Sequence, residues 1–461
     1  MTIPMAIFWL LLLISLFNDV RFNFFLFFAA LPFGDLNILP AGGSGGINVL
    51  ASSACALTLI LRVGLSISMP KTFLSEAASC MVDPKRLGLL FLFLLISVVM
   101  TFTTTSLFQG MIDVINVPGT IDKVALRGGN YNQCVNLCIS FGTVLVFFFF
   151  AADVRTRRYV PAALLINGCV LAGTGLINLA ADTLGLSVLL DGFHTTTYVR
   201  LIDAEVLGVR RLVGLMTEAS AFGGACVAAF VTLFFLQFAL DGRTRILAAG
   251  TSALLFVMAV LSTSSTAYAG LGFSVGLIGL YLGHRALSRG LIQRVDLVGP
   301  TLVLLCALLG FVAFLALAPG AADYASAMLD ATLFEKASSS SYVERMQWNE
   351  TAVGAFLASG GLGVGLGTTR ASNWFVAVLS STGIAGFCAL FAFLIRILVV
   401  RAPVDERLER LILTLRYTVV IVIFESALAG TNADFGVGFS AIMGLLAGLL
   451  DGQAHDKRWF A

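Results

Sequence analysis

The sequence predicts an all-α fold, a polytopic transmembrane helical bundle of about 12 or 13 spans, with a long extracytoplasmic loop that carries an amphipathic helix. Composition is the first observation, because the 461 residues are 58% hydrophobic and only 12% charged, about half the charged fraction of an average soluble domain. The second is that apolar runs long enough to cross a bilayer recur along the whole chain. The third is that basic residues fall on alternate loops. We therefore expect residues 1–461 to form a single integral membrane domain.

The apolar runs define the expected spans in chain order. Residues 3–33 are apolar except at Asn18–Arg21, which leaves either two short helices or one long broken helix. A loop rich in Pro and Gly follows at 34–46. Clear spans are then expected at 47–67, 87–108, 133–152, 161–181, 219–240, 245–262, 266–283, 297–318, 373–397, 413–428 and 438–450.

The distribution of Lys and Arg assigns the two sides of the membrane. Basic residues at 85–86, 155–158, 243–245, 285–294, 401–410 and 457–458 all lie on alternate loops, and these loops are assigned to the cytoplasm. The remaining loops face outward. Two of them are long and polar, the second extracytoplasmic loop at 182–218 and the large extracytoplasmic loop at 319–372.

Several classes of function and site are not indicated. The net charge is +2, which does not suggest nucleic acid as a partner. Cys134 and Cys138 have helical spacing, but no set of His or Cys ligands accompanies them, so buried free thiols are favoured over a metal site. No cofactor is predicted. A cleavable signal peptide is not expected either, because the N-terminus lacks a basic segment.

The longest polar island spans residues 338–383. Ser341 and Glu344 have the spacing of a capping box, which predicts a helix start there. Tyr342, Met346, Val353 and Phe356 fall on one face, so we expect a helix that lies along the membrane surface. It should end at Gly360–Gly361. Gly363, Gly365 and Gly367 follow, and such a loop can bring backbone N–H groups close to an anion.

Five arginines lie on loops assigned to the outside, where the positive-inside rule disfavours them. An anionic ligand is a common reason to keep an arginine there. The alternative for each is a solvated charge or an ion pair with Asp203, Glu205, Glu344 or Glu350. The five are Arg200, Arg210, Arg211, Arg345 and Arg370.

A second polar segment precedes the span at 219–240. Arg211 and Glu218 are two turns apart on one face if the segment is helical, and a carboxylate at a membrane boundary is costly unless it is paired or used. This spacing fits a structural Arg–Glu pair. It equally fits a phosphate site at Arg211, in which Glu218 orients Arg211 or acts on a hydroxyl. The hydroxyl-rich turn 261–270 is expected either to line the cavity of this phosphate site or simply to cap a helix. His194 is expected to be an exposed loop residue.

Three motifs in order resemble the O-antigen polymerase and ligase superfamily over residues 200–390. These are Arg211-x-x-Gly-x-x-x-Glu218, the Leu-Ser-x-Ser-Ser-Thr run from Leu261 with a following Tyr-x-Gly, and a long loop. That loop contains Arg345, Trp348, Gly-Val-Gly-Leu-Gly and Asn373, before a span with Gly-Ile-x-Gly. Arg345 and Gly361 also fit the Arg–x15–Gly spacing of such polymerases.

The resemblance implies a metal-independent inverting glycosyltransferase in the bacterial inner membrane, with its active site on the extracytoplasmic face. A glycan on undecaprenyl diphosphate is the implied donor, an acceptor glycan supplies the attacking hydroxyl, and a chain-length-regulating copolymerase is an implied partner. Arginines hold the diphosphate and stabilise its developing charge; by motif match these are Arg211 and Arg345. Glu218 and Glu344 are the candidate general bases. The expected substrate-binding set is Arg200, Arg210, Arg370, Asn373, Trp348 and Gly365.

Two departures favour a polymerase over an O-antigen ligase, which transfers finished glycan to lipid A-core. Ligases have a histidine just before the Asn that opens the next span, where this chain has Arg370, Ala371 and Ser372. They also tend to carry Arg where this chain has Thr266. A secondary transporter is the alternative from another class; Glu425, inside the span 413–428, favours it.

Overall fold

The computed structural model describes residues 1–39, 48–65, 72–115, 119–196, 205–206, 209–288, 340–401 and 405–451, with the isolated positions 327 and 330. The chain folds as two compact units, each built from two stretches of sequence. Unit 1 comprises Met1–Cys55 and Pro161–Ala337, and unit 2 comprises Ala56–Val160 and Ser338–Ala461. The expected span 297–318 and most of the loop 319–339 lie outside the described residues.

Eight helices in the described part of the chain are long and apolar enough to cross a membrane, and each coincides with a predicted span. The protein is therefore a multi-pass helical membrane protein, as the sequence predicts. The eight are α5 (Gly88–Leu107), α6 (Gly128–Ala152), α7 (Val160–Leu184, within the candidate span Arg157–Leu184), α8 (Ala219–Leu236), α9 (Gly242–Leu261), α10 (Ser265–Ser288), α14 (Trp374–Val399) and α15 (Glu406–Ala429).

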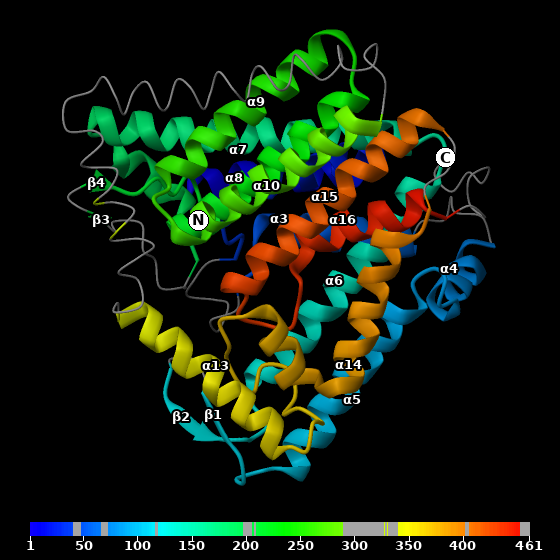
Figure 1. The fold of residues 1–461 in the computed structure, drawn as a ribbon, viewed down its shortest axis with the longest axis vertical. Coiled ribbons are helices and arrows are strands. Elements are labelled where there is room, and N and C mark those ends of the chain that lie inside the picture. The colour runs from blue at the N-terminus through cyan, green and yellow to red at the C-terminus, as the bar shows by residue number, and fades with distance from the viewer. Residues whose placement is uncertain are drawn as a thin grey trace. The chain divides into compact units, whose positions relative to one another are not determined.

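Shorter apolar helices complete the described bundle (Figure 1). Residues 3–33 form two short helices, since Asp19 ends the first run and its carboxylate caps the second by accepting from the N–H of Arg21. The predicted spans 47–67 and 438–450 correspond to two of these short helices, and one further short helix was not predicted. These helices are α1 (Ile3–Phe17), α2 (Val20–Ala30), α3 (Ala51–Leu65), α4 (Thr72–Val82) and α16 (Gly436–Leu449).

The core of unit 2 is the contact between α6 and α16. Gly444 and Gly448 are separated by one helical turn and meet the backbone of α6 at Val144 and Phe148. Small residues at this spacing let two helices approach closely enough for main-chain packing in a membrane. Helix α14 packs against α5, and α15 packs against α16.

Unit 1 is centred on α8, which contacts α9 and α10. Two 3-10 turns, η2 (Ser187–Phe193) and η3 (Gln237–Ala239), accompany its helices. So does a small antiparallel pair of strands, β3 (Glu205–Val206) and β4 (Val209–Arg210), in which Glu205 pairs with Arg210. The 3-10 turn η1 (Arg157–Tyr159) belongs to unit 2.

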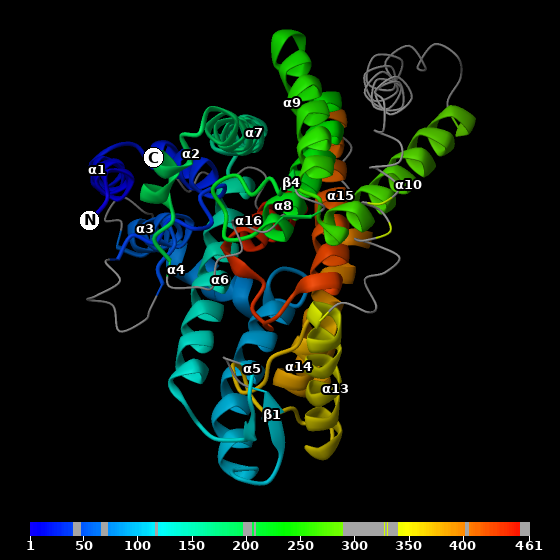
Figure 2. The same ribbon diagram turned by 90° about the vertical axis from the view of Figure 1, so that its left-hand side faces the viewer.

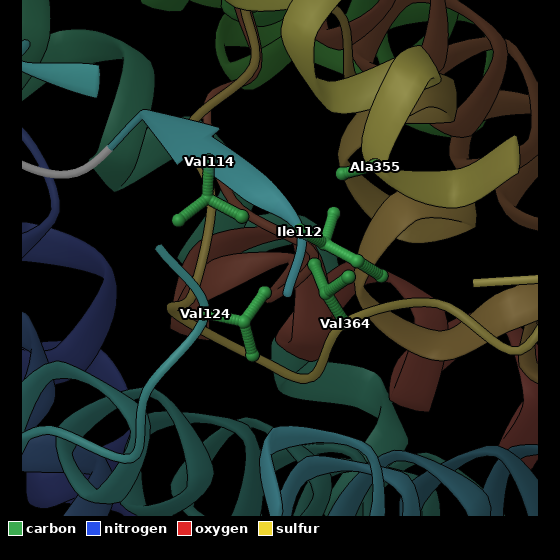
Figure 3. Close-up of a cluster of buried hydrophobic side chains, with 5 residues drawn as sticks. All are labelled: Ile112, Val114, Val124, Ala355 and Val364. Carbon is green, nitrogen blue, oxygen red and sulfur yellow. The ribbon is translucent and has the colours of Figure 1, made fainter. Parts of the chain in front are cut away.

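A β-hairpin that the sequence analysis did not predict lies at the end of α5 in unit 2. Strands β1 (Asp113–Ile115) and β2 (Ile121–Lys123) pair antiparallel, with Val114 opposite Asp122. Helix α13 (Ser340–Ala358) lies beside this hairpin in both views (Figures 1 and 2). A small apolar core joins the hairpin, α13 and the glycine loop (Figure 3), formed by Ile112, Val114, Val124, Ala355 and Val364.

Candidate functional site

Helix α13 positions the candidate residues of the large loop. It ends before Gly360 and Gly361, both of which have positive φ, so its predicted end is confirmed. Its described part begins at Ser340, so Ser341 already lies within the helix, and the residues just before Ser340 lie outside the described part of the chain. Its buried stripe is Trp348, Ala352 and Ala355, which packs against α14 and β1. Small side chains on this stripe allow the helix axis to approach its neighbours.

The predicted apolar face of α13 points away from this packing. Of its predicted members, Tyr342, Met346 and Val353 are between 37% and 39% exposed, whereas Phe356 is half-buried. Leu357, which was not among them, is 67% exposed. Helical geometry of about 100° per residue separates this face from the buried stripe and from the polar side that carries Glu344, Gln347 and Thr351. An exposed apolar face agrees with the predicted surface helix.

Trp348 and Arg370 are brought together by the return of the chain after the glycine loop. Trp348 is buried, and the guanidinium carbon of Arg370 lies 4.0 Å from the centre of its ring. The N–H of Arg370 donates to the carbonyl of Ile115 at 2.8 Å, which ties this return to β1. Asn349, next on α13, accepts the N–H of Ser372 at 2.7 Å. The arginine is thereby held against an aromatic face, which favours a fixed cationic site.

Arg345 lies one turn before Trp348 and Asn349 on α13, so the three are neighbours on the helix surface. Its side chain is half-buried. Within the part of the chain that the structure describes, no carboxylate or carbonyl pairs with it. The predicted alternative of an ion pair with Glu344 or Glu350 is absent there. Two guanidinium groups, one without an ion-pair partner among the described residues and one held on the Trp348 ring, are suited to an anion with two negative charges.

The glycine loop has a structural role that differs from the predicted one. The N–H of Gly363 donates to the hydroxyl of Ser359, and the N–H groups of Val364 and Gly365 donate to the carbonyls of Ser380 and Ser381. Gly365 is buried, and a Cβ there would lie 2.9 Å from the Cα of Thr101. Its N–H therefore has a protein partner and does not face an anion; the expectation for Gly365 is corrected to one of packing.

Asn373 opens α14 as predicted. Its side-chain oxygen accepts from the N–H groups of Phe375 and Val376, at 2.9 and 3.3 Å, which makes it the N-cap. This use of the amide oxygen leaves its NH2 group for other partners. Glu344 is exposed on α13, and a Cβ on Gly119 would lie 3.7 Å from its Oε1, so it faces the hairpin.

The hairpin adds two basic residues to this side of unit 2 that the sequence analysis did not single out. Lys123 pairs with Asp113 at 2.7 Å and Arg127 pairs with Asp122 at 2.6 Å. Pro118-Gly119 in the sequence is a turn signal that would have predicted the hairpin. Each of these basic residues is balanced by a carboxylate, whereas Arg345 has no such partner among the described residues.

In unit 1, Arg210 is an ion-paired residue. Its guanidinium contacts Asp182 at 2.8 Å, and Asn178 donates to the other oxygen of the same carboxylate at 3.0 Å. Asn178 also accepts the N–H groups of Val213 and Gly214. This network fixes the segment after β4 to the end of α7, with a carboxylate partner that the sequence analysis did not name.

Arg211 reaches the turn between α9 and α10. Its guanidinium donates to the hydroxyl of Thr263 at 3.2 Å and to the carbonyl of the same residue at 3.1 Å. Thr263 has φ of +46°, a left-handed conformation that non-glycine residues seldom adopt. The predicted proximity of the hydroxyl-rich turn to Arg211 is therefore present, through Thr263.

Glu218 does not share a helical face with Arg211, which corrects that expectation. Residues 211–218 are not helical, because Gly214 has positive φ and α8 begins only at Ala219, with Glu218 at the N-cap position. The hydroxyl of Ser220 donates to the carboxylate of Glu218. The described contacts therefore do not include one in which Glu218 orients Arg211.

The expectation that His194 is exposed is wrong. It is 8% exposed, and its Nδ1 lies 2.7 Å from Oδ2 of Asp35, which is fully buried. Thr196 donates to the other oxygen of Asp35. The N–H of Asp35 in turn donates to the carbonyl of Leu215, so this pair fastens three loop segments of unit 1 together.

The candidate residues are divided between the two units. Arg210, Arg211 and Glu218 belong to unit 1, and Arg345, Trp348 and Arg370 belong to unit 2; Arg200 lies outside the described residues. No family model and no curated protein matches the chain. The described residues form one group of arginines in each unit. The group in unit 2 contains Arg345, a guanidinium without a partner among the described residues.

Proposed function

We propose that the chain is an inner-membrane glycosyltransferase that polymerises undecaprenyl-diphosphate-linked oligosaccharide repeat units into an O-antigen, capsular or exopolysaccharide. The half-buried guanidinium of Arg345, which has no partner among the residues that the structure describes, carries this proposal. A diphosphate needs two or more cationic donors, and Arg345 with Arg370 on Trp348 supplies them in one unit.

Stabilisation of a leaving diphosphate requires donors whose orientation does not change during the reaction. The ring of Trp348 and the bond from Arg370 to Ile115 provide such restraint. The exposed apolar face of α13 supports the proposal further, because a polyprenyl carrier delivers its headgroup from the membrane surface.

Replacing Arg345 with Ala and with Lys tests the proposal in a strain that lacks the native gene. We expect Arg345→Ala to leave protein level unchanged and to abolish long glycan chains, and Arg345→Lys to restore little, since lysine cannot bond two oxygens in parallel. Arg127→Ala is the matched control, because Arg127 is a basic residue of unit 2 that is already paired with Asp122. A normal distribution of chain lengths in Arg345→Ala would contradict the proposal.

The lipid-linked glycans that accumulate in the strain without the native gene distinguish a polymerase from a ligase. Loss of a ligase leaves long chains on the lipid carrier, whereas loss of a polymerase leaves single repeat units. A transporter remains a second candidate because the Oε1 atom of Glu425 is buried in α15 without a hydrogen-bond partner. Substrate uptake that Glu425→Gln abolishes, with normal glycan lengths, would favour the transporter.

A further inference from the structure

Arg285 is a half-buried cation of unit 1 that has no carboxylate partner among the described residues. It lies in the last turn of α10. Its Nη1 atom donates to the hydroxyl of Tyr281 at 2.5 Å. Its Nε atom is buried and has no hydrogen-bond partner in the described part of the chain, an uncommon state for a buried donor. The ion pairs described in unit 1 all belong to other residues.

Two aromatic rings hold the Arg285 guanidinium in place. Its central carbon lies 5.9 Å from the centre of the Phe238 ring and 5.9 Å from the centre of the Tyr281 ring. Tyr281 is packed in turn, edge to face, against the buried Phe235 at 5.1 Å. A ring face attracts a cation through its quadrupole but carries no net charge. The rings therefore fix the position of the guanidinium and leave its charge to be balanced by another group.

The contacts of the three guanidinium nitrogens show from which side that group approaches. Nε is enclosed, and Nη1 is used by Tyr281. Nη2 is not enclosed and has no bond to a described residue. An incoming anion therefore meets the Nη edge of Arg285. A phosphate suits this edge, because a guanidinium presents its N–H groups as a planar fork that matches phosphate oxygens.

The surroundings of Arg285 on α10 favour a phosphate that belongs to a lipid. The candidate membrane span of this helix comprises Ser265–Arg285, so the arginine lies at the end of the span, where long basic side chains reach the headgroup level. Leu280 and Leu287 lie two turns apart on an adjoining face of the helix and are 73% and 91% exposed. A phosphate with acyl chains uses both the cation and this apolar face, whereas a free phosphate uses only the cation.

We propose that Arg285 binds the phosphate of an anionic phospholipid, with Nη2 donating to a phosphate oxygen and the acyl chains lying along Leu280 and Leu287. A lipid with a net negative charge is favoured over a zwitterionic one, because only the former neutralises the arginine. The loop after α10 is predicted to face the cytoplasm, where basic residues at the ends of spans attract anionic lipid. The inference does not depend on the proposed function, since it concerns another unit and another arginine.

Thermal unfolding of the purified full-length chain in detergent tests the lipid class. The probes are dioleoylphosphatidylglycerol, dioleoylphosphatidylcholine and the water-soluble glycerol 3-phosphate. A ligand that binds only the folded state raises the unfolding midpoint saturably, and we expect this rise with phosphatidylglycerol at concentrations where the other two have little effect. An equal rise with phosphatidylcholine would show that the charge is not recognised. An equal rise with glycerol 3-phosphate would assign the site to a soluble phosphate. Either result would overturn the proposal.

Variants of Arg285 connect the binding to this residue. We expect Arg285→Gln to bind phosphatidylglycerol at least about tenfold more weakly, the effect of losing one hydrogen bond from a charged donor. Arg285→Lys keeps the charge without the planar fork and should bind with intermediate affinity. Arg410→Gln is the matched control, because Arg410 is also half-buried and predicted to be cytoplasmic but is paired with Glu406; its affinity should not change.

Unfolding midpoints measured without lipid show whether each variant is folded, and Arg285→Lys supplies the comparison if Arg285→Gln is not. Unchanged affinity for phosphatidylglycerol in a folded Arg285→Gln protein, or an equal loss in Arg410→Gln, would refute the site at Arg285.

Discussion

The guanidinium of Arg370 lies 4.0 Å from the centre of the Trp348 ring, although the two residues are separated by the whole end of α13 and the glycine loop. This contact requires the chain to turn back along α13, which the positive φ angles of Gly360, Gly361 and Gly363 permit. It holds the Arg370 guanidinium of the proposed diphosphate site against Trp348, which is one helical turn along α13 from Arg345.

Replacement of Trp348 should separate the contribution of its ring from that of its apolar volume. We expect Trp348→Phe to retain most glycan synthesis and Trp348→Leu to lose much more, because only Phe keeps an aromatic face for Arg370, an interaction of about 0.5–2 kcal/mol. Chain-length distributions on gels measure the effect, and unfolding midpoints in detergent show whether folding is intact. Equal activity in the two variants would mean that the ring face has no role.

Substitution of Gly365 should destabilise unit 2 strongly. Its φ is +90°, and a Cβ would lie 2.9 Å from the backbone of Thr101, so we expect Gly365→Ala to lower the free energy of unfolding by about 2 kcal/mol or more. Gly354→Ala is the matched control. Gly354 is exposed on α13 with no atom near its absent Cβ, and alanine there should stabilise the helix by about 0.5–1 kcal/mol. Denaturant titration in detergent measures both.

Arg86 should behave as a structural residue, although the sequence assigned it to a cytoplasmic loop. It is 4% exposed and contacts Glu76 at 2.7 Å and Asp451 at 2.6 Å. Arg86→Ala leaves the buried Asp451 and the half-buried Glu76 without their cation and is expected to cost about 3–5 kcal/mol of stability. Arg410→Ala, which removes a more exposed pair with Glu406, should cost under about 1 kcal/mol. Similar unfolding midpoints for the two variants would contradict this difference.

Asp434 should make stability depend on pH. Burial raises the pKa of Asp434 above its ordinary value of 3.8, although hydrogen bonds from Ser140, Gly436 and Phe435 lower it. The folded state therefore binds the proton more tightly than the unfolded state. Its contribution is fully present below pH 3.8 and is lost as pH rises through the folded pKa. Asp434→Asn should flatten this part of the pH–stability curve; an unchanged slope would show that Asp434 does not titrate there.

Features that depend on local sequence were predicted correctly. The apolar runs located all eight long helices, because each must bury its backbone hydrogen bonds within one segment in a membrane. The C-terminal end of α13 followed from two glycines, and Asn373 was found at the start of α14. None of these needs a contact with a distant part of the chain.

Contacts between distant segments were not predictable in this way. The burial of His194 depends on Asp35, the pairing of Arg210 depends on Asp182, and the bonds of Arg211 depend on Thr263. The glycine loop was expected to expose its N–H groups, but Ser359, Ser380 and Ser381 accept them. Each partner lies outside any local pattern.

The sequence by itself determined that this chain is a multi-pass helical membrane protein and where most of its helices begin and end, because hydropathy and capping act within a single segment. Only the tertiary structure decided which arginines are neutralised and which is not, since a side chain acquires its partners when separate segments pack. The proposed anion site rests on this distinction between Arg127 and Arg210, which are ion-paired, and Arg345, which has no partner among the described residues.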